Sequence, residues 1–218
     1  MQGLMMDMPL LVSSILQHAA RHFSDTEVVS RRVEGDLHRY TYADCERRTR
    51  KLADAFVRTG VGIGDRVATL AWNGYRHLEL YYAVGGMGAV IHTLNPRLHP
   101  QQIAWIVNHA GDEHLAFDLT FLPIVEAIAE HCPNVKSWIA MCDADRQPKS
   151  DKLPNLVNYE SFLERGSEGF EWPQLDERTA VGLCYTSGTT GNPKGAMYTH
   201  RSTVLHAYAS ALPDGMGA

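Results

Sequence analysis

Short apolar segments alternate with longer amphipathic segments between residues 67 and 141, and this alternation constrains the fold more than any other feature of the sequence. The apolar segments have the length of buried strands, and the segments between them have the spacing of helices. Strands that alternate with helices form a mostly parallel sheet with helices on both faces, so the sequence predicts an α/β fold. The predicted strands are 67–72, 89–94, 115–118 and 135–141, and the predicted helices are 78–86, 100–110 and 121–132.

The segments before and after this region carry further local signals. Residues 9–23 have the apolar spacing of a helix, and residues 26–40 have the pattern of a β-hairpin that turns around Gly35. Thr41 and Asp44 form a capping box at the start of the next helix. Beyond a polar linker at 143–155 we predict a helix at 159–165, a strand at 180–185, a strand at 196–199 and a helix at 201–212.

The composition excludes several classes of protein. The chain has 218 residues and a formal net charge of -5, whereas a nucleic-acid-binding surface is usually basic. No apolar run approaches the roughly 20 residues of a membrane span, and the N-terminus lacks the basic region of a signal peptide. The four cysteines are scattered without a C-x-x-C pair, as is typical of free thiols in a reducing compartment. We therefore expect a cytoplasmic protein that binds no nucleic acid.

A loop rich in glycine and hydroxyl groups follows the predicted strand at 180–185. Residues 185–195 have the sequence YTSGTTGNPKG. Glycines let the backbone approach a ligand, and successive N–H groups in such turns bind anions. Hydroxyl groups and a lysine add side-chain donors for phosphate oxygens. The candidate phosphate-binding residues are Thr186, Ser187, Gly188, Thr189, Thr190, Gly191 and Lys194.

Other loops share parts of this pattern. A plain hairpin turn or a flexible Ser/Gly linker is also rich in glycine, but the dense hydroxyl groups directly after an apolar strand favour phosphate binding. The loop is not a Walker A loop, because Lys194 lies between Pro193 and Gly195 instead of preceding Ser or Thr. No G-x-S-x-G motif is present, so Ser187 is a candidate donor and not a nucleophile.

Three further features favour structural roles or stay open. His18 and His22 have the helical spacing of metal ligands, but no third ligand is evident. The segment HTLNPRL, residues 92–98, ends a strand where ligands often bind, yet a turn through Pro96 explains it as well and is favoured. Arg201 is suited either to bind phosphate or to cap the following helix.

The loop resembles the phosphate-binding signature of adenylate-forming enzymes, the superfamily of acyl-CoA synthetases, luciferases and peptide-synthetase adenylation domains. The longer stretch YTSGTTGNPKGAMYTHRS is similar to the version in fatty-acyl-CoA ligases. The upstream segments HRYTYADCERRTRKLADAF, GVGIGDRVATLAWN and HLELYYAVGGMGAVIHTLNPRLHPQQIAWIVNHA resemble medium- and long-chain fatty-acid-CoA ligases. The similarity covers nearly the whole chain.

The resemblance implies a two-step reaction. A carboxylate attacks the α-phosphate of ATP and expels pyrophosphate, and the thiol of coenzyme A then attacks the acyl-adenylate. The resemblance also implies a magnesium ion, with Thr186 nearest to it and to the triphosphate. Ser187 to Gly191 would surround the β- and γ-phosphates, and Lys194 would neutralise their charge.

Several downstream motifs of the superfamily do not occur in the sequence. They are the Tyr-Gly-x-Thr-Glu segment, the Tyr-x-Thr-Gly-Asp segment and the C-terminal lysine. We therefore expect residues 1–218 to be the first portion of an N-terminal AMP-binding domain, inactive alone, with the main catalytic residues beyond position 218. The alternatives are a ligase for an aryl or small acid, and a non-catalytic folding or dimer-forming module. A homodimer is compatible with each of these hypotheses.

Overall fold

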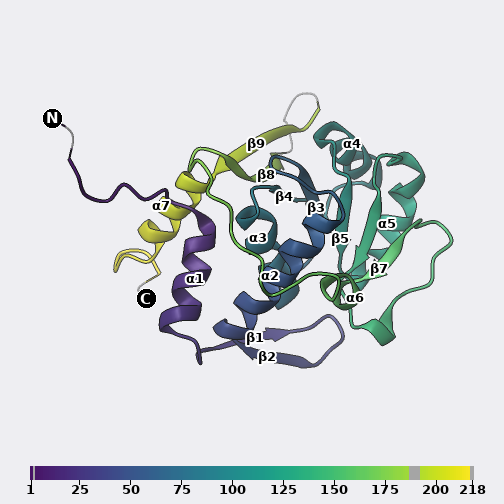
Figure 1. Ribbon diagram of the computed structural model, residues 1–218. Helices are drawn as coiled ribbons and strands as arrows, with labels where there is room; N and C mark the ends of the chain where they lie inside the picture. The colour runs from purple at the N-terminus through teal and green to yellow at the C-terminus, as the bar shows by residue number, and fades with distance from the viewer. Residues whose placement is uncertain (2, 187–191, 217–218) are drawn as a thin grey trace.

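The computed structural model describes residues 1, 3–186 and 192–216, and within these ranges a seven-stranded sheet forms the centre of the protein (Figure 1). The strand order is β7-β6-β5-β3-β4-β8-β9, and all neighbours are parallel except β8 and β9. The mostly parallel sheet predicted from the alternation is therefore confirmed. The strands are β3 (Arg66–Leu70), β4 (Val90–Thr93), β5 (His114–Phe117), β6 (Ser137–Ala140), β7 (Leu156–Asn158), β8 (Ala180–Thr186) and β9 (Lys194–Thr199).

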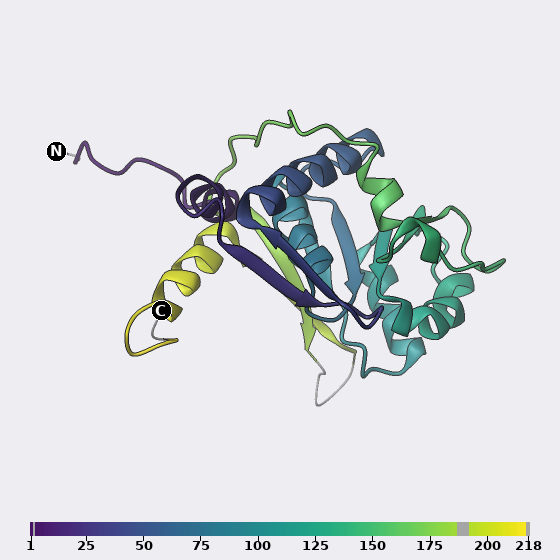
Figure 2. The same ribbon diagram turned by 90° about the horizontal axis from the view of Figure 1, so that it is seen from below.

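Helices cover both faces of the sheet (Figure 2). Neighbouring residues of a strand point to opposite faces, so Val67 packs with one group of helices and Ala68 with the other. Each face buries its own apolar cluster, and this burial is the main force that holds the layers together. One face carries α2 (Tyr42–Arg58), α3 (Tyr75–Gly86) and α6 (Tyr159–Leu163), and the other carries α4 (Pro100–Ala110) and α5 (Leu122–Ile128).

Two elements lie beside the β8–β9 end of the sheet, and a hairpin forms a small sheet of its own. Helices α1 (Val12–His22) and α7 (His200–Ser210) contact each other there. Strands β1 (Glu27–Arg31) and β2 (Leu37–Thr41) form the predicted hairpin, and Gly35 takes a positive φ of 99° in its turn.

The predicted capping box is also confirmed. The Asp44 amide donates to the Thr41 hydroxyl at 3.2 Å, and the Thr41 amide donates to the Asp44 carboxylate at 3.0 Å. Without these two hydrogen bonds, backbone N–H groups at the start of α2 would lack partners.

The structure corrects one missed strand and several predicted boundaries. Strand β7 lies at residues 156–158, which the sequence assigned to no strand, because three residues are too few to show periodicity. Helix α3 begins at Tyr75 and not at residue 78. The helix predicted at 121–132 is α5 flanked by two 3-10 turns. Strand β9 begins at Lys194 and not at residue 196, because its pairing with β8 extends the strand.

A network of buried and partly buried ion pairs connects α2, α3, α6 and the hairpin. The fully buried Glu79 carboxylate pairs with the Arg48 guanidinium at 2.8 Å and accepts a hydrogen bond from the Tyr159 hydroxyl at 2.7 Å. Arg76 pairs with Glu160 at 3.0 Å and with Glu34, in the hairpin turn, at 2.8 Å. Buried charges are costly unless they are paired in this way.

Candidate functional site

Strands β8 and β9 bring two of the predicted phosphate-binding residues together. Thr186 ends β8 and Lys194 begins β9, and the two residues are partners in the antiparallel ladder. The Thr186 hydroxyl lies 3.5 Å from the carbonyl oxygen of Lys194. Both residues are exposed to solvent. The ladder therefore fixes the distance between the two ends of the loop.

The other predicted phosphate-binding residues lie outside the described part of the chain. They are Ser187, Gly188, Thr189, Thr190 and Gly191. Their role in binding phosphate stays a prediction.

The position of the loop in the sheet suits a ligand-binding site. Strands β3, β4, β5 and β8 run parallel, so their carboxyl ends share one edge of the sheet. The loop follows the carboxyl end of β8. In open α/β sheets ligands bind at this edge.

The charge at the loop is also suited to an anion. Lys194 forms no ion pair within 4.0 Å with any carboxylate in the described ranges. A compact ammonium with no carboxylate partner among these residues is available to bind phosphate.

Thr186 fits an oxygen ligand of a magnesium ion, whereas protein carboxylates do not gather here. The described residues contain no group of three or more His, Cys, Asp or Glu side chains that would hold a metal. Magnesium in nucleotide sites takes most of its ligands from phosphates and water, with only one or two from the protein. An exposed threonine hydroxyl at the loop therefore fits such an ion, if the phosphates of ATP supply further ligands.

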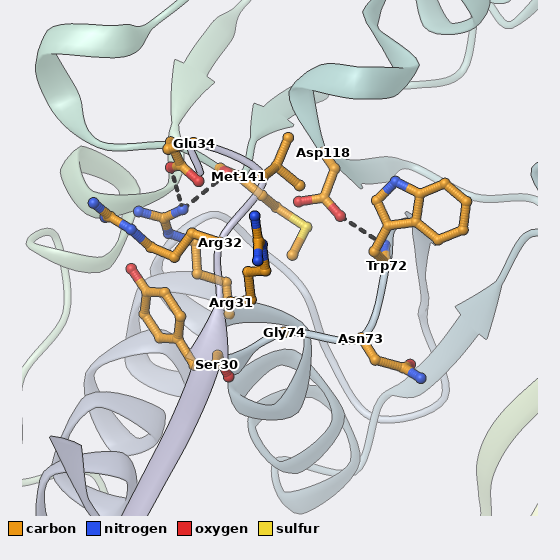
Figure 3. Close-up of a pocket in the computed structure, with 12 residues that line it drawn as sticks. Ser30, Arg31, Arg32, Glu34, Trp72, Asn73, Gly74, Asp118 and Met141 are labelled. Carbon is orange, nitrogen blue, oxygen red and sulfur yellow. Dashed lines mark hydrogen bonds and ion pairs between the residues drawn. The ribbon is translucent and has the colours of Figure 1, made fainter. Parts of the chain in front are cut away.

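A small hollow lies at the same edge, between the hairpin and the ends of β3, β5 and β6 (Figure 3). At its rim the Trp72 amide donates to the Asp118 carboxylate at 2.6 Å, and burial raises the pKa of Asp118 to about 6. The order of strands changes direction between β3 and β5, where α/β sheets often bind ligands. The cavity volume of about 30 Å³ is close to that of one water molecule, so the hollow is too small for a nucleotide or an acyl chain.

A larger groove lies at the opposite edge of the sheet. It has a volume of about 820 Å³ and lies between α1, residues 171–174 and Tyr208 of α7. The amide of Val12, at the start of α1, bonds to His200, whose own amide bonds to Thr179 just before β8. The groove is therefore near the amino end of β8, away from the loop.

The structure also places the three features that favoured structural roles or stayed open. The imidazole rings of His18 and His22 lie 4.6 Å apart and are tilted by 42° relative to each other. The Arg97 amide bonds to the Asn95 side chain at 3.0 Å, which confirms the turn after β4. Arg201, at the start of α7, forms an ion pair with Glu177 at 2.5 Å.

Two expectations from composition agree with the described part of the chain. All four cysteines are free, and only Cys184 is half-exposed instead of buried. Across residues 1, 3–186 and 192–216, every helix is too short or too polar to cross a membrane.

Comparison with known proteins gives a consistent family. A model of the AMP-binding enzyme family matches residues 16–217. The chain is 47% identical over 217 residues to 3-methylmercaptopropionyl-CoA ligase of Ruegeria lacuscaerulensis, covering 100% of this chain and 40% of that protein. It is 47% identical over 214 residues to medium-chain-fatty-acid–CoA ligase of Ectopseudomonas oleovorans, covering 98% of this chain and 39% of that protein.

The same architecture occurs in a crystal structure of anthranilate CoA ligase in complex with anthranoyl-AMP. The TM-score is 0.78 at 20% sequence identity, over 93% of this chain and 37% of that chain. This likeness confirms the fold. The chain spans about two-fifths of the length of the two curated relatives above.

Proposed function

The chain belongs to the AMP-binding enzyme family, and we propose that the whole protein is an ATP-dependent, AMP-forming ligase that joins an aliphatic carboxylic acid to coenzyme A. In this proposal residues 1–218 are the first portion of the N-terminal AMP-binding domain and hold the outer phosphates of ATP. The rest of the protein supplies the groups that hold the ribose and the acid. A cytoplasmic location fits this chemistry, since ATP and coenzyme A are abundant there.

One observation carries the proposal. Thr186 and Lys194 are paired and exposed at the carboxyl end of β8, and Lys194 has no carboxylate partner in the described ranges. A hydroxyl group and a free cation, held at one edge of a parallel sheet, suit a polyphosphate.

The reaction proceeds in two substitutions. An oxygen of the acid attacks the α-phosphorus of ATP, the bond to the β-phosphate oxygen breaks, and pyrophosphate leaves. The sulfur of coenzyme A then attacks the acyl carbon, and AMP leaves. Lys194 stabilises the negative charge that builds up on the departing pyrophosphate, and Thr186 orients the phosphates. Magnesium, when bound beside Thr186, supplies further neutralisation of phosphate charge.

The relatives favour an aliphatic acid over an aromatic one. The two ligases that are 47% identical to this chain bear the names of a 3-methylmercaptopropionyl and a medium-chain fatty acyl product. The aromatic-acid ligase shares only 20% identity, which carries the fold alone. A ligase for an aryl acid is therefore the second candidate, and a non-catalytic folding or dimer-forming module is the third; a small aliphatic acid falls within the first candidate.

ATP–pyrophosphate exchange by the full-length protein tests the proposal. The acids to compare are 3-methylmercaptopropionate, octanoate, palmitate and benzoate, each with ATP and Mg²⁺. We expect exchange with at least one aliphatic acid and coenzyme A ester formation when coenzyme A is added. Exchange with benzoate alone would favour the aryl ligase, and no exchange with any acid would favour the non-catalytic module.

A further inference from the structure

Tyr185, the residue before Thr186, is held from helix α4. Its hydroxyl group lies 2.6 Å from Nδ1 of His109, a residue 76 positions earlier in the chain. Trp105, one turn before His109, stacks on the imidazole at 4.6 Å and meets the tyrosine ring edge-on at 6.5 Å. Burial raises the pKa of the Tyr185 hydroxyl above its ordinary value, so the group stays neutral and able to donate.

The ring of Tyr185 also packs against the other strand of the loop. Tyr185 and Gly195 are partners in the ladder between β8 and β9. A Cβ atom at position 195 would lie 3.2 Å from Cζ of Tyr185 and 3.1 Å from Cδ1 of Leu183, closer than ordinary side-chain contacts. Gly195 therefore leaves room for the tyrosine ring, one residue after Lys194.

A buried histidine–aspartate pair lies behind the tyrosine. The ring of His92 is 5.3 Å from the ring of Tyr185, and its Nδ1 is 2.7 Å from the Asp112 carboxylate. Both side chains are fully buried, and burial raises the pKa of Asp112. Nε2 of His92 and Oδ1 of Asp112 find no hydrogen-bond partner among the described residues. A buried polar atom without a hydrogen-bond partner lowers the stability of the fold. The His92–Asp112 pair therefore costs the core some stability.

We propose that Tyr185 is a positioning residue for Thr186 and Lys194. Its ring packs on Gly195, and its hydroxyl group is hydrogen-bonded to His109, so the two ends of the loop are tied to the rigid helix α4. The proposal rests on the proposed function, because it concerns the binding of ATP. Tyr185 acts through its neighbours and is not assigned a contact with ATP.

The test is steady-state kinetics of the full-length enzyme with two variants that cut the same bond from its two sides. Tyr185→Phe keeps the ring and removes the hydroxyl group, and His109→Ala removes its partner. We expect each variant to raise KM for ATP about two- to tenfold, the change that the loss of one neutral hydrogen bond produces. KM for the acid and for coenzyme A should stay unchanged. The double variant should be no worse than His109→Ala alone, because both substitutions break the same hydrogen bond.

Two further variants separate positioning from stability. His109→Asn places a polar atom near the position of Nδ1 and should restore most of the affinity for ATP. His131→Ala removes another exposed histidine, whose side chain pairs with Glu130 at 3.6 Å, and should leave all three KM values unchanged. The melting temperature of each variant, measured without ATP, shows whether the fold is retained.

The KM for ATP of these variants decides whether Tyr185 positions the loop. An unchanged KM for ATP in both Tyr185→Phe and His109→Ala overturns the proposal, and so does an equal rise of all three KM values. If the wild-type protein catalyses no exchange with any acid, the proposed function fails, and calorimetric titration with MgATP then decides the role of Tyr185. The positioning role of Tyr185 would be overturned if the wild-type protein and Tyr185→Phe bound MgATP with equal affinity. It would also be overturned if neither protein bound MgATP.

Discussion

Replacement of Lys194 by alanine separates the binding of ATP from the stability of the fold. The side chain is exposed and forms no ion pair with a described carboxylate, so its loss should change the free energy of unfolding by less than about 0.5 kcal/mol. A hydrogen bond to a charged group contributes about 1.5–3 kcal/mol. If Lys194 binds phosphate, its loss should slow the adenylation step about 10- to 150-fold.

ATP–pyrophosphate exchange by the full-length protein measures this change. Lys194→Arg keeps the positive charge and should retain more activity than Lys194→Ala, although the larger guanidinium does not match a compact ammonium. Lys152→Ala is the matched control, since Lys152 is exposed and also forms no ion pair with a described carboxylate. Its exchange rate should equal that of the wild type.

The result that refutes the argument is an exchange rate for Lys194→Ala within about twofold of the wild-type rate, since RT ln 2 is far below the free energy of a charged hydrogen bond. A large loss of rate together with a lower melting temperature would show instead that Lys194 stabilises β9. In that case the lysine would be structural, and the loop would bind phosphate through other groups.

The remaining predictions concern stability. Glu79→Gln should lower the free energy of unfolding in urea by about 3 kcal/mol, because it removes the fully buried one of the two carboxylates that pair with the half-buried Arg48. An unchanged free energy of unfolding would refute the importance of the Glu79–Arg48 pair. Gly166→Ala should lower it by about 1–3 kcal/mol, since the added Cβ would overlap the carbonyl oxygen of Lys51, and an unchanged urea midpoint would contradict this. Asp118 has a pKa of about 6 in the fold, which is above its value in the unfolded chain. Protonation of Asp118 therefore stabilises the fold, and this contribution is fully present below about pH 4. The contribution is lost as the pH rises through 6. Relative to Asp118→Asn, the wild-type protein should therefore lose about 2 kcal/mol of stability between pH 4 and pH 7 in urea unfolding; a pH-independent difference would argue against the raised pKa.

Local physical chemistry made much of the fold predictable from the sequence. Periodicity reports which face of an element is buried, so the strands and helices between residues 67 and 141 were found in the right order. The capping box at Thr41 and the turn at Gly35 depend only on residues that are close in the sequence. The phosphate-binding loop was also visible, because its hydroxyl groups, glycines and lysine are consecutive.

These local signals did not predict which residues far apart in the sequence pack against each other. The order of the strands, with β5 between β3 and β6, follows from how the helices cover the two faces and not from any single segment. Strand β7 exists because β6 offers it hydrogen-bond partners. The contact of Tyr185 with His109, and that of Arg48 with Glu79, join residues that have no sequence pattern in common. Such pairs form only when the chain has folded, because the free energy that selects them comes from burial of the whole core and not from the preferences of either residue.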